Sequence, residues 1–210
     1  MFLKKRAAKV NEKLTGRSKP GKQALNSSHL NLKKENWKEH SGLANIVAKS
    51  LPMLAFNEKG LLVPNQPILS DLEEIRKVFT QEIASPRRTE LFENYLRYLE
   101  DLKALIGEEF YQWINGSFVS KKLIPQDIDL VVFAPWQLVN KFDKELKELK
   151  SPLSLKTYGV DAYFVKVYEE HHRDYFLFLS DKAHWLDFFG KTREDRNHHT
   201  FKKGFLEVKS

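Results

Sequence analysis

The sequence predicts a mixed α/β protein of the α+β kind, in which a mixed β-sheet is flanked by helices. Segments rich in β-branched and aromatic residues alternate along the chain with segments of helical periodicity. The apolar fraction of 41%, which includes fifteen Phe, seven Tyr and four Trp, is enough to fill a core. The 210-residue chain contains no cysteine, which excludes a disulfide scaffold and a thiolate zinc site.

Two helices are predicted from their N-terminal capping signals. The first is expected to begin at the capping box Ser70-Asp71-Leu72-Glu73, in which the Ser70 hydroxyl accepts from the Glu73 amide. The second is expected to begin at Ser85-Pro86, with proline at the first helical position, and to end at Gly107. Apolar residues recur at helical spacing after both starts, so each helix presents one face to a core.

The second half of the chain is predicted to alternate strands with helices. Strands are expected at 110–114, 127–133, 160–168 and 204–208, and helices from Trp136 to near Ser151-Pro152 and over 172–189. Earlier in the chain, Phe56 to Leu62 has the pattern of a turn between two short extended segments.

The chain divides into a basic extension, residues 1–52, and a folded domain, residues 53–210. Residues 1–39 carry eleven Lys or Arg against three Glu, a net charge of +8, so the remainder of a chain of net charge +7 carries 7 − 8 = −1. Two interpretations stay open for this extension. It is either a partly disordered leader with one short amphipathic helix over 42–51, or a cationic segment that binds RNA or DNA.

No apolar run approaches the roughly twenty residues that a membrane helix needs, so no membrane partner is expected. The first three residues lead directly into Lys4-Lys5-Arg6 without an apolar stretch, and no secretory signal is therefore expected. Together with the absence of cysteine, these features favour a cytoplasmic protein.

Two acidic residues open the strand predicted at 127–133. Side chains alternate along a strand, so Asp127 and Asp129 are expected to point one way while Ile128 and Leu130 point into the core. Carboxylates this close repel one another, and between apolar neighbours they are costly unless a cation neutralises them. Mg²⁺ is the natural candidate, because it takes oxygen ligands and commonly uses one or two carboxylates plus substrate phosphates.

A third acid, Asp161, heads another predicted strand in a similar apolar setting, Val160-Asp161-Ala162. If the two strands lie side by side, three carboxylates converge on one edge of the sheet. Phosphoryl or nucleotidyl transfer with two metals requires such an arrangement, and Asp161 is therefore included with Asp127 and Asp129 as a candidate metal ligand.

The strand predicted at 110–114 ends at Asn115-Gly116-Ser117. Glycine there would let the backbone approach a phosphate, and its amide and the Ser117 hydroxyl can donate to phosphate oxygens. Lys121 or Lys122 in the following loop can add a phosphate contact or simply be solvated. Four later cations have the same two interpretations, with solvent exposure the favoured one: Arg193, Arg196, Lys202 and Lys203.

These residues together resemble the signature of the DNA polymerase β-like nucleotidyltransferase superfamily. The resemblance rests on Ile114-Asn115-Gly116-Ser117-Phe118, on the acidic pair Asp127 and Asp129, and on Asp161 in a later strand. More narrowly, residues 53–210 look like a group of small uncharacterised bacterial nucleotidyltransferase-like proteins.

The resemblance implies a nucleotidyltransferase fold and a Mg²⁺-dependent transfer of a nucleoside monophosphate from an NTP such as ATP. The acceptor would be a hydroxyl of RNA, protein or a small molecule, in a toxin–antitoxin or phage-defence setting. By analogy, Asp127 and Asp129 would hold the metals and Asp161 would help to activate the acceptor hydroxyl. Gly116 and Ser117 would contact the triphosphate.

A second hypothesis is a non-catalytic module of the same fold that binds nucleic acid or a partner protein through the basic extension. Hydrolysis or transfer of a phosphate by the same three acids is a third. The sequence keeps all three acids, which favours the enzyme.

Overall fold

The structure is a computed structural model, and it describes residues 54–210. The expected basic extension, residues 1–52, and the helix predicted over 42–51 lie outside the described residues.

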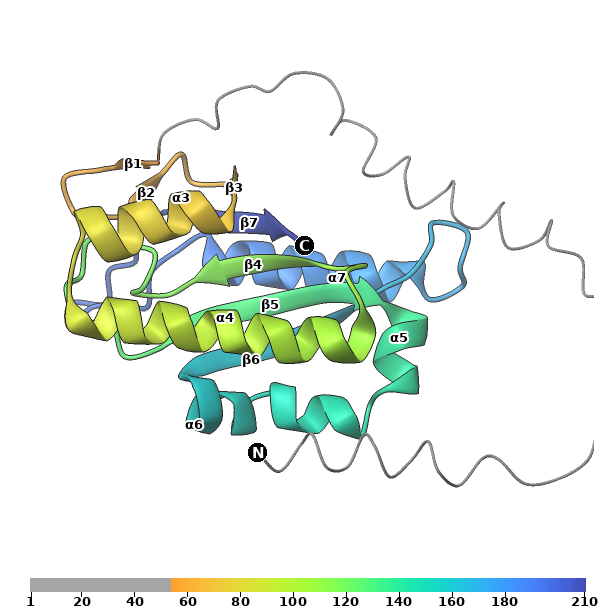
Figure 1. Cartoon of the computed structure of the whole chain (residues 1–210). Helices are drawn as coiled ribbons and strands as arrows, with labels where there is room; N and C mark the ends of the chain where they lie inside the picture. The colour runs from red at the N-terminus through yellow and green to blue at the C-terminus, as the bar shows by residue number, and fades with distance from the viewer. Residues whose placement is uncertain (1–53) are drawn as a thin grey trace, which may run out of the picture. The chain divides into compact units, whose positions relative to one another are not determined.

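A five-stranded mixed sheet forms the centre of the described part (Figure 1). Its strand order is β3 (Pro67–Ser70), β7 (Phe205–Lys209), β4 (Tyr111–Asn115), β5 (Ile128–Pro135) and β6 (Val160–Val167). The pairs β3–β7 and β5–β6 are parallel, whereas β4 runs antiparallel to both of its neighbours. The predicted α+β class with a mixed sheet is confirmed.

A separate two-stranded sheet precedes it. Strands β1 (Ala55–Phe56) and β2 (Leu62–Val63) pair antiparallel around a turn, as predicted for this segment.

Helices cover both faces of the large sheet. In chain order they are α3 (Leu72–Arg76), a π-helical segment η1 (Lys77–Glu82), α4 (Pro86–Ile106), α5 (Trp136–Lys141), a 3₁₀ segment η2 (Glu145–Leu149), α6 (Leu153–Tyr158) and α7 (Tyr175–Phe189). In Figure 1, α4 lies in front of the sheet and α7 behind it. Two separate clusters of buried apolar side chains correspond to these two sides.

Strand β5 contributes to both cores because its successive side chains point to opposite faces. Leu130 and Val132 belong to the core that includes the buried face of α4, and Val131 and Phe133 belong to the core beneath α7. This two-sided burial explains the nearly continuous apolar run of the strand. Asp129 has the parity of Val131, so it lies on the α7 side at the start of the strand.

The first helix begins one residue later than the predicted capping box. Asp71 is the N-cap, and its side chain accepts from the Glu74 amide at 2.8 Å, while the Ser70 hydroxyl donates to the Glu74 carboxylate at 2.7 Å. Ser70 is the last residue of β3, where its backbone pairs with Val208. The prediction that Ser70 caps the helix was therefore wrong, because the sheet holds Ser70 in extended conformation.

Other predicted elements differ in their bounds. The helix expected from Trp136 to near Ser151-Pro152 is α5 followed by η2, and the helix expected from His172 begins at Tyr175. Strand β3 and helix α6 were not predicted. Among residues 54–210, no helix is long and apolar enough to cross a membrane.

Candidate functional site

The parallel pairing of β5 and β6 brings two of the predicted acids together. Asp129 and Asp161 are register partners in adjacent strands, and Asp127 immediately precedes β5. Both strands begin at the same edge of the sheet, so the three acids lie at that edge. The structure therefore brings Asp129 and Asp161 side by side, with Asp127 directly before β5.

Gly116 packs directly against this acidic edge. It follows β4 with a φ of +83°, a conformation that side-chain-bearing residues rarely adopt. A Cβ built on Gly116 would lie 1.9 Å from Oδ2 of Asp129. Only glycine therefore lets the backbone of this loop and the Asp129 carboxylate lie so close together.

A buried arginine holds the loop that follows Gly116. Arg88 of α4 is fully buried and donates to the carbonyls of Phe118, at 2.7 Å, and of Lys122, at 3.0 Å. It also donates to the carbonyl of Ser120. Burial lowers the pKa of Arg88 to about 10, so the guanidinium stays charged at neutral pH. With these carbonyls turned inward, the loop is fixed in place beside the acids.

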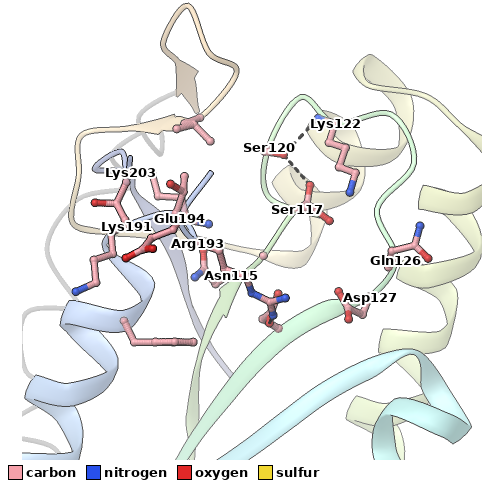
Figure 2. A pocket seen from close by; sticks show the side chains of 16 residues that line it. Asn115, Ser117, Ser120, Lys122, Gln126, Asp127, Lys191, Arg193, Glu194 and Lys203 are labelled. Atoms are coloured by element: carbon pink, nitrogen blue, oxygen red, sulfur yellow. Dashed lines mark hydrogen bonds and ion pairs between the residues drawn. The ribbon is translucent and has the colours of Figure 1, made fainter. Parts of the chain in front are cut away.

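Acids, loop and a cluster of cations surround one cavity of about 800 Å³. In Figure 2, Gln126 and Asp127 lie on one side, Ser117, Ser120 and Lys122 belong to the loop above, and Lys191, Lys203 and Glu194 lie on the opposite side. Asp129, Asn115 and Arg193 also line it. The cavity therefore has an acidic wall facing a largely basic one.

The basic wall comes from the segment between α7 and β7. Lys203 is 7% exposed, and burial lowers its pKa to about 8, although the nearby Asp129 partly opposes that shift. Its backbone amide donates to the carbonyl of Gly190, which folds this segment back on itself. Arg193 is mostly exposed, and its guanidinium lies 3.9 Å from Oδ1 of Asp129. The prediction of solvent exposure was therefore wrong for Lys203. The other three cations are exposed as expected: Lys202, Arg193 and Arg196.

The positive charges near Asp129 do not fully compensate the negative charge of its carboxylate. Burial raises its pKa first, Asp127 raises it further, and Asp161 adds to the effect. Arg193 and Lys203 oppose the shift without cancelling it. A cation bound at this edge would remove the repulsion.

The donor set fits a divalent cation held by two carboxylates. Asp127 and Asp129 line the same cavity as Asn115, which is buried and whose Oδ1 has no hydrogen-bond partner. Mg²⁺ commonly takes one or two carboxylates and completes its shell with substrate phosphates and water. Within residues 54–210, no group of three or more His, Asp or Glu side chains is arranged to hold a metal. These residues therefore fit a metal ion whose remaining ligands come from a substrate, and not a metal ion held by protein ligands alone.

A family model matches residues 54–209. The chain belongs to DUF6932, a family of unknown function. The match covers nearly all of the part that the structure describes, including every residue of the cavity. No curated protein and no solved structure matches this DUF6932 chain.

Asp161 faces a second, smaller cavity. This cavity of about 290 Å³ is also lined by Tyr163 and by His184 and Trp185 of α7, and it shares Asp129, Phe188 and Arg193 with the larger one. The DUF6932 site thus has two compartments that meet at Asp129. Asp161 belongs to the smaller compartment, and Asp127 to the larger.

Of the six predicted site residues, Lys121 is the one that the structure places apart from both cavities. Its amine lies 5.4 Å from the ring centre of Phe56, and the backbone near Gly60 packs against its side chain. In the described part of the chain, Lys122 lines the cavity and Lys121 does not.

Sequence reasoning missed Arg88 and did not single out Asn115. Arg88 sits in a helix whose other arginines are partly or fully exposed, and no local pattern marks it as buried. Asn115 did carry a signal, since it is the last residue of β4 and directly precedes Gly116, but an Asn-Gly pair is equally typical of an ordinary turn.

Proposed function

We propose that this DUF6932 chain is a Mg²⁺-dependent nucleotidyltransferase that moves a nucleoside monophosphate from an NTP to a hydroxyl acceptor. One observation carries the proposal. Asp129 pairs in register with Asp161 on one side and packs against Gly116 on the other. In this proposal, Asp129 is a metal ligand that lies between Asp161, the general base, and the phosphate loop at Gly116.

The triphosphate would occupy the larger cavity. Ser117 lies at its edge, and its hydroxyl would donate to phosphate oxygens. Lys203 and Lys191 on the opposite wall would bind the other phosphate oxygens of the triphosphate. Lys203 would contact them directly, because its amine is buried in the wall of the cavity.

Asp127 and Asp129 would hold the metal, which when bound would neutralise charge on the phosphate oxygens. Asp161, in the adjoining compartment, would accept the proton of the acceptor hydroxyl. The division into two compartments supports transfer between two substrates, with the triphosphate in one and the acceptor in the other.

The test is a thermal-shift titration of the full chain with each of the four NTPs, with and without Mg²⁺. Ligand that binds the native state raises the melting temperature by mass action. We expect a rise for at least one NTP that needs Mg²⁺, and we expect Asp127→Asn with Asp129→Asn to abolish it. The control is Asp143→Asn, an exposed acid paired with Lys150.

An NTP-dependent rise of the same size in the double variant would contradict the proposal. So would the absence of any rise in the folded wild-type chain at millimolar NTP, and in that case the hypothesis of a non-catalytic binding module would be favoured.

A further inference from the structure

The smaller cavity already contains a hydroxyl group beside the candidate general base. Tyr163 follows Asp161 by two residues in β6, so both side chains lie on the same face of the strand. The Tyr163 hydroxyl donates to Oδ2 of Asp161 at 3.3 Å. This is the contact that an acceptor hydroxyl would make with the residue that removes its proton.

Tyr163 is also close to the other half of the site. It pairs in register with Val131. This pair lies two residues further along the strands than the pair of Asp129 and Asp161, on the same face of the sheet. Tyr163 and Asp129 line the same cavity, and Asp129 also lines the proposed triphosphate compartment. Tyr163 is 41% exposed, so a ligand can reach it.

Neighbouring aromatic residues fix the direction of the ring. The centre of the Tyr163 ring lies 4.9 Å from that of Trp185 in α7, and Trp185 packs in turn on the buried Phe189. The Tyr163 ring therefore packs against an aromatic side chain that is itself in contact with the core, and this packing limits the positions that its hydroxyl can take.

We propose that Tyr163 is a self-modification site, at which the chain transfers a nucleoside monophosphate to its own phenol. The proposal rests on the nucleotidyltransferase function proposed above. It identifies one acceptor class, a tyrosyl hydroxyl, for the second compartment.

The step balances with an NTP as the co-reactant. The phenol oxygen of Tyr163 forms a bond to the α-phosphorus, and the bond between that phosphorus and the oxygen bridging to the β-phosphate breaks. Pyrophosphate leaves with the bonding pair, and the phenol proton passes to the Asp161 carboxylate. The product is a tyrosyl phosphodiester, with no change in oxidation state.

The other tyrosines nearby lack this setting. Tyr158 is buried on the opposite side of the sheet and donates to Asp101 at 2.7 Å. Tyr168 stacks on Trp136 at the far end of β6. Both differ from Tyr163 in having no contact with Asp161.

The experiment is to incubate the full chain with each NTP and Mg²⁺ and to measure its intact mass, with thermal-shift measurements in parallel. We expect a gain of one nucleoside monophosphate, located by fragmentation of the tryptic peptide 157–166. That peptide contains Tyr158 as well as Tyr163, so the unmodified Tyr158 is an internal control.

We expect Tyr163→Phe to lose the mass gain and to keep the NTP-dependent thermal shift, whereas Tyr168→Phe keeps both. Asp161→Asn should slow labelling by about 100-fold or more, the usual contribution of a general base. Labelling of another residue, or labelling that persists in Tyr163→Phe, would overturn the self-modification site.

The two proposals fail in different ways. A Mg²⁺-dependent NTP shift without any mass gain overturns self-modification at Tyr163 and leaves the nucleotide site standing. The absence of both the shift and the mass gain overturns the proposed function and the self-modification together.

Discussion

At the scale of single residues, Gly116 shows how closely the site is packed. Gly116→Ala would add a Cβ 1.9 Å from the Asp129 carboxylate, which must then move. The positive φ adds strain of about 1–2 kcal/mol. We expect lower stability in urea unfolding and loss of the Mg²⁺-dependent NTP shift.

Gly107→Ala is the matched control for Gly116→Ala. Gly107 has a similar φ of +80°, but a Cβ there would meet no atom within 4 Å. It should show the backbone cost alone and keep the NTP shift. Equal effects of the two substitutions on NTP binding would show that the contact with Asp129 has no role.

Lys203 makes stability depend on pH. Its pKa falls from 10.5 in its ordinary state to about 8 because it is buried. Between these values the unfolded chain binds one proton more than the native chain, so the free energy of unfolding rises with pH. The slope from this residue is up to about 1.4 kcal/mol per pH unit. Lys203→Met should remove this rise in urea unfolding.

The measurement belongs between about pH 8 and 9.5, because buried tyrosines with raised pKa, such as Tyr95 and Tyr98, lower stability above pH 10. The exposed Lys202 supplies the control, and Lys202→Met should keep the wild-type slope. A slope unchanged in Lys203→Met would mean that Lys203 keeps its ordinary pKa.

At the scale of elements, Arg88 joins helix α4 to the loop after β4. Replacing it with lysine keeps a charge but removes the planar set of donors that reaches three carbonyls. Each buried carbonyl left without a donor costs about 1–3 kcal/mol. We expect Arg88→Lys to lower the free energy of unfolding by about 3 kcal/mol and to increase hydrogen exchange in residues 117–122.

Arg97 is exposed in the same helix, so Arg97→Lys should change stability by less than about 0.5 kcal/mol. If exchange of the loop is unaffected in Arg88→Lys, the arginine contributes stability without positioning the loop.

The elements that sequence predicted well are those with complete local signals. Helix α4 begins at Ser85-Pro86 and ends before Gly107 as expected. Strand β5 coincides with the apolar run that predicted it. Strand β3 and helix α6 are only four and six residues long, too short for a periodic pattern to show. Their structure depends on partners distant in the chain, since β3 is completed by pairing with β7.

At the scale of the whole molecule, the site is assembled from distant segments. Residues 115–117, Asp127 and Asp129, Asp161, and residues 191–194, 200 and 203 line the two cavities at one sheet edge. The acids could be predicted because each opens a strand with a strong pattern. The basic wall and the division into two compartments could not, since both depend on how the segment after α7 folds back over the sheet.

The uneven charge of the chain predicts where a polyanion would bind. Residues 1–39 carry +8, and the rest of the chain carries about −1. We expect the full chain to bind a single-stranded RNA oligonucleotide with an affinity that falls as salt rises, and a fragment of residues 53–210 to lose that binding. Fluorescence anisotropy at two salt concentrations tests this. Equal binding by the fragment would assign the interaction to the folded domain.

The central claim is that Asp127 and Asp129 hold a divalent cation together with a triphosphate. Mn²⁺ prefers the same carboxylate and phosphate oxygens as Mg²⁺, and its bound fraction can be measured by electron paramagnetic resonance. We predict that a non-hydrolysable NTP increases Mn²⁺ binding to the full chain and that Asp129→Asn abolishes the increase. Mn²⁺ binding that does not depend on the nucleotide, or that is unchanged in Asp129→Asn, would contradict the claim.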